Sequence, residues 1–241
     1  PIGTTVSHLF SWRATFVLIT LCSGLVLILL LVSLPRQQEK VPSGILQQFV
    51  LLRDGRIFLS ILTVFFGASS AYVLYTYLTP VFEEYVGIPV PYISLVLLLF
   101  GVMVLCSNLL SGKMAARRGI YKLRFSYIAL AVCMFLLPLA LQGGWTGLPV
   151  IFAIGLLMYL QNSPIQVNVL NIATKEYPGA VTLAASTNSF SFNFGIAFGS
   201  VCGSTIVKHL NMGLLGLGGG VLALCALGCG LLLYRKTELP H

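Results

Sequence analysis

GKMAARRGIYK, residues 112–122, places four of the chain's fourteen basic residues in eleven positions. The runs on either side, 88–112 and 125–174, contain no Asp, Glu, Lys or Arg. Short basic stretches between long apolar runs are typical of membrane proteins, because Lys and Arg collect in the cytoplasmic loops that join spanning helices.

The composition excludes an ordinary soluble domain. Of the 241 residues, 57% are hydrophobic and 8% are charged, whereas a soluble domain carries about 25% charged residues. A spanning helix needs roughly 20 mostly apolar residues, and the uncharged runs supply them, the longest being divided by QGGWTGLP at 142–149. The sequence therefore predicts an all-α membrane protein without strands. Its seven predicted transmembrane helices cover residues 13–34, 57–79, 91–111, 124–142, 147–171, 179–207 and 212–234.

The positions of the basic residues also predict the orientation of these helices. Twelve of the fourteen lie in segments 35–56 and 112–124, at Lys175 or in the C-terminal tail, and two, Arg13 and Lys208, lie toward the other side. Because cytoplasmic loops carry the excess of bases, we expect a cytoplasmic C-terminus. With seven helices the N-terminus is then outside, so we expect an odd number of further helices before Pro1.

Several function classes find no support in the residues. The net charge of +8 lies in loops between apolar spans, so no nucleic-acid partner is predicted. The six cysteines all fall in predicted spans without the close pairing of a zinc site, and no metal site is predicted. The chain has no Ser-His-Asp or Cys-His set and no phosphate-binding glycine loop. We therefore predict that the protein is not an enzyme, that it has no catalytic residues and that it binds no cofactor.

The spacing within the opening stretch is informative in itself. Gly112 favours a close helix approach or a tight turn, Gly119 offers a position open to positive φ, and Arg117 and Lys122 can cap helices or pair with carboxylates. Plain positive-inside charge, which needs no spacing, is the alternative. The spacing resembles the loop signature of the major facilitator superfamily, G-x-x-x-D-R/K-x-G-x-R/K-R/K, with matches at Gly112, Arg117, Gly119 and Lys122. Ala116 stands where that family has Asp.

The start of the chain resembles the same family. PIGTTVSHLFSWRATF is similar to the end of the antiporter motif on the family's fifth helix and the entry to the sixth. YTYLTPVFEEYVG, NSPIQVNVLNIA and AASTNSFSFNFGIAFGSVCGS resemble the drug/proton antiporter-type branch, near bacterial arabinose-, sugar- and purine-efflux proteins. The residues that match the antiporter motif and the helix entry are Pro1, Gly3, Trp12, Arg13 and Phe16.

This resemblance implies a twelve-helix fold with both termini cytoplasmic, of which the chain is the C-terminal portion, helices six to twelve. Residues 1–34 are then the end of the fifth helix and the sixth helix, 35–56 the cytoplasmic interdomain loop, and 57–241 the C-terminal six-helix bundle. Within the loop, residues 43–55 form either a short helix on the membrane surface or an ordinary linker.

Polar side chains within the spans are the candidates for a solute site. Polar groups at membrane depth tend to face a bundle interior or a water-filled cavity, although hydrogen bonds between helices are an alternative role. Pro164 is expected to kink its helix, and Gly195, Gly199 and Gly203 have the spacing that lets helices approach closely. The candidate cavity residues are Tyr72, Tyr75, Thr76, Gln161, Asn162, Gln166, Asn188 and Asn193.

These features predict a secondary-active efflux transporter that moves a small organic solute, such as a sugar, nucleoside or drug, by alternating access. The resemblance alone implies proton-coupled antiport and the bacterial inner (plasma) membrane, with the solute, protons, the lipid bilayer and the missing N-terminal helices as partners. No Asp or Glu lies within a predicted span, so the proton-carrying group is expected on the missing helices. The alternatives are a non-transporting truncated fragment and a complete seven-helix receptor.

Overall fold

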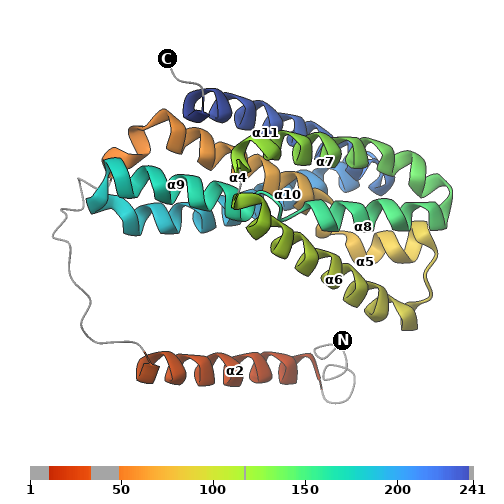
Figure 1. Ribbon diagram of the computed structural model, residues 1–241. Coiled ribbons are helices and arrows are strands. Elements are labelled where there is room, and N and C mark those ends of the chain that lie inside the picture. Colours follow the sequence, from red (N-terminus) through yellow and green to blue (C-terminus); the bar gives the residue numbers. More distant parts are fainter. Residues whose placement is uncertain (1–10, 34–48, 117, 239–241) are drawn as a thin grey trace. The chain divides into compact units, whose positions relative to one another are not determined.

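The computed structural model describes residues 11–33, 49–116 and 118–238, and every regular element in these ranges is a helix (Figure 1). The chain divides into two units, Pro1–Pro42 and Ser43–His241. Pro1, Gly3, Arg117 and residues 43–48 of the 43–55 segment lie outside the described residues, as does the side chain of Trp12.

The first unit contributes one helix, α2 (Trp12–Ser33). It is strongly apolar, and none of residues 13–33 is buried within the structure. An exposed apolar helix of 22 residues matches the length that a bilayer requires. The helix predicted at 13–34 is therefore confirmed.

The second unit is a helical bundle. The part of the chain that the structure describes holds seven segments long and apolar enough to cross a membrane, α2 included, which confirms the predicted number. Short 3₁₀ turns at Val50–Arg53, Gly144–Thr146, Pro178–Ala180 and Met212–Leu214 precede or join the long helices. These long helices are α4 (Gly55–Tyr75), α6 (Val90–Ala115), α7 (Gly119–Gln142), α8 (Gly147–Leu157), α9 (Asn162–Glu176), α10 (Val181–His209) and α11 (Leu215–Glu238).

Helix α4 lies at the centre of this bundle, with α10 and α11 packed against it (Figure 1). Gly195, Gly199 and Gly203 of α10 meet successive turns of α4: a methyl group added at Gly195 would lie 2.5 Å from the carbonyl oxygen of Phe65, and one at Gly203 would lie 2.8 Å from that of Val73. A methyl group at Gly199 would overlap the carbonyl of Ser69. The predicted close approach through small residues is confirmed.

Two spans are interrupted. After α4 the chain turns at residues 76–77 and continues through α5 (Leu78–Pro80) and a π-helical segment (Val81–Val86). This helical stretch ends at Gly87, where φ is 77°. The helical structure thus extends into 82–86, which the sequence assigned to a loop. The predicted fifth span is divided into α8 and α9 by a turn at 158–161. Pro164 explains this break, because proline lacks an N–H and its ring clashes with the carbonyl four residues earlier.

The basic stretch that predicted the fold differs from expectation in its backbone. Helix α6 continues through Gly112 to Ala115 and α7 begins at Gly119, so the connection is shorter than the predicted loop. The positive φ expected at Gly119 belongs instead to Arg118, at 47°. Gly119 is needed for space, since a methyl group there would lie 2.9 Å from the Cβ of Pro164. Gly112 meets nothing within 4 Å, so the close approach expected there is not found.

Substitution of Gly199 by Ala should destabilise the bundle by about 1–3 kcal/mol. The added methyl group overlaps the backbone of Ser69, which is held in helix α4 and cannot move aside as a flexible side chain could. Gly101→Ala is the matched control, since a methyl group at this helical glycine of α6 meets nothing within 4 Å. The measurement is the free energy of unfolding of the purified proteins in mixed detergent micelles. Equal stability of the two variants would contradict the packing described here.

Candidate functional site

A groove runs between α9 and α10. Its larger part has a volume of about 380 Å³, and an adjoining hollow of about 160 Å³ shares three lining residues with it, Asn162, Asn188 and Ser189. We call both parts together the amide groove. No Asp, Glu, Lys, Arg or His is among its lining residues, which are Tyr159, Asn162, Ser163, Gln166, Val167, Ala185, Asn188, Ser189, Phe192 and Asn193.

The amide side chains of the groove are hydrogen-bonded, two of them across it. The Asn188 Nδ2 donates to Asn162 Oδ1 at 2.7 Å, and Gln166 Nε2 donates to the Ala185 carbonyl at 3.2 Å. The Asn193 Nδ2 donates to the Ser189 carbonyl of its own helix at 2.8 Å. Each side-chain amide carries two N–H groups, of which Asn188, Gln166 and Asn193 use one each and Asn162 uses none in these bonds. The bonds of Asn188 and Gln166 join α9 to α10, and the unused N–H groups leave hydrogen-bonding capacity for a solute.

One end of the amide groove is aromatic. The ring of Tyr159 stacks on Phe192 with 5.3 Å between centroids, and Tyr72 of α4 meets Phe192 edge-on at 6.0 Å. The hydroxyls of Tyr72 and Tyr159 lie 3.2 Å apart. Tyr75 extends this cluster, with its ring 5.0 Å from Tyr72 and 6.0 Å from Phe100. A solute in the groove would meet amides along its length and flat rings at one end.

The break between α8 and α9 places Tyr159 and Asn162 at the groove, and two serines of α6 hold it. The backbone N–H of Tyr159 donates to Ser107 Oγ at 2.9 Å, and that of Ser163 donates to Ser111 Oγ at 2.8 Å. Both serines are fully buried. At membrane depth a backbone N–H without a partner is costly, so these hydroxyls stabilise the interruption. Sequence reasoning missed both, although their spacing of four on one helix face was a visible signal.

Other predicted cavity residues lie elsewhere. Gln161 is only 3% exposed and its Oε1 accepts a hydrogen bond from the Tyr127 hydroxyl, which also lies 3.2 Å from the Thr63 carbonyl oxygen. It therefore joins helices in the packed interior, the alternative that the sequence left open. Thr76 pairs with Ser200 of α10 at 2.8 Å. The residues that the structure brings together are Asn162, Gln166, Asn188 and Asn193 in the groove, with Tyr72 and Tyr75 behind its aromatic end.

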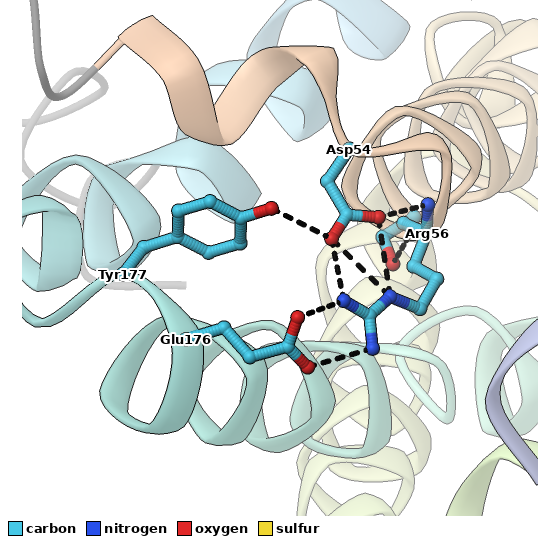
Figure 2. Close-up of polar contacts among 5 residues, drawn as sticks. Asp54, Arg56, Glu176 and Tyr177 are labelled. Atoms are coloured by element: carbon cyan, nitrogen blue, oxygen red, sulfur yellow. Dashed lines mark hydrogen bonds and ion pairs between the residues drawn. The ribbon is translucent and has the colours of Figure 1, made fainter.

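An ion-pair cluster fixes the far end of α9. Figure 2 shows the guanidinium of Arg56 between the carboxylates of Asp54 and Glu176. Arg56 Nη2 donates to Asp54 Oδ2 at 2.6 Å, Nη1 donates to Glu176 Oε1 at 2.8 Å, and a second bond joins Nη2 to Glu176 Oε2. Asp54 also caps α4 by accepting from the Arg56 N–H at 2.8 Å. The cluster ties the start of α4 to the end of α9.

The same contacts shift the ionisation of two residues just outside the spans. Burial raises the pKa of the Asp54 carboxyl, but hydrogen bonds and charge from Arg56 outweigh this and leave its pKa below the ordinary value. Burial raises the pKa of Tyr177, and the negative charges of Asp54 and Glu176 add to the effect. The Tyr177 hydroxyl donates to Asp54 Oδ2 at 3.4 Å, so it remains a donor at neutral pH.

Comparison with known proteins gives the family. The family model described as Major Facilitator Superfamily matches residues 1–188. The chain belongs to the Major Facilitator Superfamily. This membership contradicts the alternative of a complete seven-helix receptor, which the sequence had left open. The chain is also 28% identical over 213 residues to "Uncharacterized MFS-type transporter YtbD" of Bacillus subtilis (strain 168), an alignment that covers 88% of this chain and 54% of that protein. It thus spans about half the length of that relative.

Ser107→Ala should destabilise the turn between α8 and α9. Without the hydroxyl, the Tyr159 N–H loses its acceptor, at a cost of about 1–3 kcal/mol. Hydrogen exchange of a peptide covering residues 157–163, measured by mass spectrometry in lipid nanodiscs, should accelerate. The control is Ser60→Ala, a buried serine that donates only to the Arg56 carbonyl of its own helix. Unchanged exchange in Ser107→Ala would contradict the stabilising role.

Arg56→Gln should lower the free energy of unfolding at pH 7 by about 1–3 kcal/mol, because it leaves a buried carboxylate without its partner. The contribution of Asp54 is complete above the ordinary Asp pKa of 3.8 and is lost as the pH falls through the lowered pKa of the folded protein. The deficit of the variant should therefore shrink in acid. Lys113→Gln, at an exposed base, is the control, and a deficit that stays constant down to low pH would contradict the assignment.

Proposed function

We propose that the chain is the C-terminal part of a secondary-active transporter that exports a small uncharged organic solute by alternating access. The observation that carries the proposal is the amide groove beside a broken helix. Transporters of this kind place their solute near the bilayer midplane, at helices whose interruption exposes polar groups to a cavity. The family membership supports transport, and the chemistry of the groove supports an uncharged solute.

The groove lining favours solutes with hydroxyl, carbonyl or amide groups. Asn162, Gln166 and Asn188 offer donors and acceptors without a net charge. A charged solute would lose its hydration in the groove without gaining an ionic partner there, which is unfavourable. The aromatic end formed by Tyr159 and Phe192 favours a solute that also carries a flat or apolar face. Sugars, nucleosides and uncharged drugs share these properties.

Export and proton coupling are the finer parts of the proposal, and they rest on the resemblance to antiporters in residues 1–16, 75–87, 162–173 and 184–204. An acid or His within the membrane is the usual proton carrier. Because no such residue lines the amide groove, we place the carrier on an N-terminal bundle that works with this chain. In this arrangement residues 1–34 belong to that bundle, residues 35–56 join the halves, and 57–241 form the C-terminal bundle of a bacterial inner-membrane protein with a cytoplasmic C-terminus.

A second candidate is a fragment that inserts in the membrane without transporting. The observation that favours it is α2, an apolar helix in which none of residues 13–33 is buried. Because the chain spans about half of its relative, its competence depends on the N-terminal bundle. Efflux measured with and without that bundle distinguishes the two candidates.

Asn188→Ala and Gln166→Ala should each weaken solute export. Each removes a hydrogen-bonding group that a bound solute would otherwise satisfy, a cost of about 1–3 kcal/mol or roughly five- to hundredfold in affinity. The assay is efflux of arabinose, adenosine and an uncharged amphiphilic dye from cells that express the transporter with its N-terminal half, normalised to inserted protein.

The matched control is Thr205→Val on the same helix as Asn188, since the exposed Thr205 hydroxyl bonds only to the Val201 carbonyl of its own turn. It should transport normally. Near-normal efflux by both amide variants across the whole panel would mean that these amides only join helices, and the solute site would have to lie elsewhere.

A further inference from the structure

Arg124 lies on the second turn of α7 in an unusual setting. Its guanidinium carbon is 3.8 Å from the centroid of the Tyr121 ring and 4.6 Å from that of Phe125. The Nε is buried and has no hydrogen-bond partner within the described residues. The ion pairs found there involve Arg56 and not Arg124. The two rings stabilise the charge, but an aromatic ring does not replace an acceptor for the in-plane N–H groups.

The surroundings of Arg124 are positively charged. The Tyr121 ring packs against Tyr234 of α11 with 5.6 Å between centroids, so the start of α7 lies beside the end of α11. Arg118, Lys122 and Arg235 are exposed at these two helix ends. No Asp or Glu occurs in residues 88–125, and the one acid of α11 is its last residue, Glu238. We call Arg118, Lys122, Arg124 and Arg235 the basic patch.

The position of Arg124 along α7 matches the boundary between hydrocarbon and lipid headgroups. It is five residues beyond Gly119, or about 7.5 Å at 1.5 Å per residue, and helical side chains lean toward the N-terminus, here toward the end of the bundle. Long basic side chains reach the interface in this way. Further along α7, Phe125 and Ile128 are 55% and 46% exposed and present an apolar surface suited to acyl chains. Tyr121 and Tyr234 are of the residue type found at this level.

We infer that the basic patch, centred on Arg124, binds the phosphate of an anionic phospholipid whose acyl chains lie along the exposed apolar face of α7. The planar N–H groups of arginine match phosphate oxygens in pairs. The other three bases disfavour a headgroup that carries its own ammonium, so phosphatidylglycerol or cardiolipin should bind better than phosphatidylethanolamine. The adjoining apolar face distinguishes a lipid from a soluble phosphate, since only the lipid gains from it. The site is separate from the amide groove.

The test is native mass spectrometry of the purified, delipidated protein titrated with phosphatidylglycerol or with phosphatidylethanolamine of the same acyl chains. The wild type should hold phosphatidylglycerol more tightly, and Arg124→Gln should lose this affinity by about fivefold or more. Arg235→Gln changes an exposed side chain without disturbing the packing, and it should lower the affinity in the same direction. Lys208→Gln, at the exposed end of α10, is the control and should bind as the wild type does.

Three results would overturn the inference. The first is equal retention of the two lipids by the wild type. The second is full phosphatidylglycerol affinity in both arginine variants, with their unfolding temperatures unchanged. The third is displacement of phosphatidylglycerol by millimolar inorganic phosphate, which would identify a site for soluble anions instead of a lipid site.

Discussion

The close approach of α4 and α10 is the constraint on which the rest of the bundle depends. Gly195, Gly199 and Gly203 leave no room for even a methyl group against the carbonyls of α4, so the rotation of α10 about its axis is fixed. That rotation directs Asn188 and Phe192 toward α9 and Tyr72, where the amide groove forms. Between helices in a bilayer, such packing supplies the attraction that the hydrophobic effect supplies in water.

The second constraint is the satisfaction of backbone groups where a helix is interrupted. Pro164 breaks the span between α8 and α9, and Ser107 and Ser111 accept the N–H groups that the break leaves free. The same proline packs on Gly119, the first residue of α7. The basic stretch that predicts membrane orientation is therefore in direct contact with the segment that places Asn162 at the groove. A displacement of the start of α7 would therefore move Pro164 and, with it, Asn162 at the candidate solute site.

The sequence alone predicted the features that depend on local composition. Uncharged runs of sufficient length specify spanning helices, and a glycine at every fourth position specifies close packing, so both predictions were confirmed. The features that depend on non-helical backbone were not predictable by helical spacing. Gln161 and Asn162 are neighbours, yet the turn at 158–161 places one in the core and the other on the groove. The left-handed residue is Arg118 and not Gly119, because neighbouring packing decided where the glycine was needed.

Solute protection of a single cysteine tests the amide groove most directly. Ser189 lines both parts of the groove and is exposed, so Ser189→Cys, in a background without the native cysteines, should react with a maleimide reagent. The solute that the efflux assay identifies should slow this reaction in proportion to its occupancy, and it should leave the reaction of a Lys208→Cys control unchanged. Equal labelling of the cysteine at position 189 with and without saturating solute would contradict the assignment of the groove as the solute site.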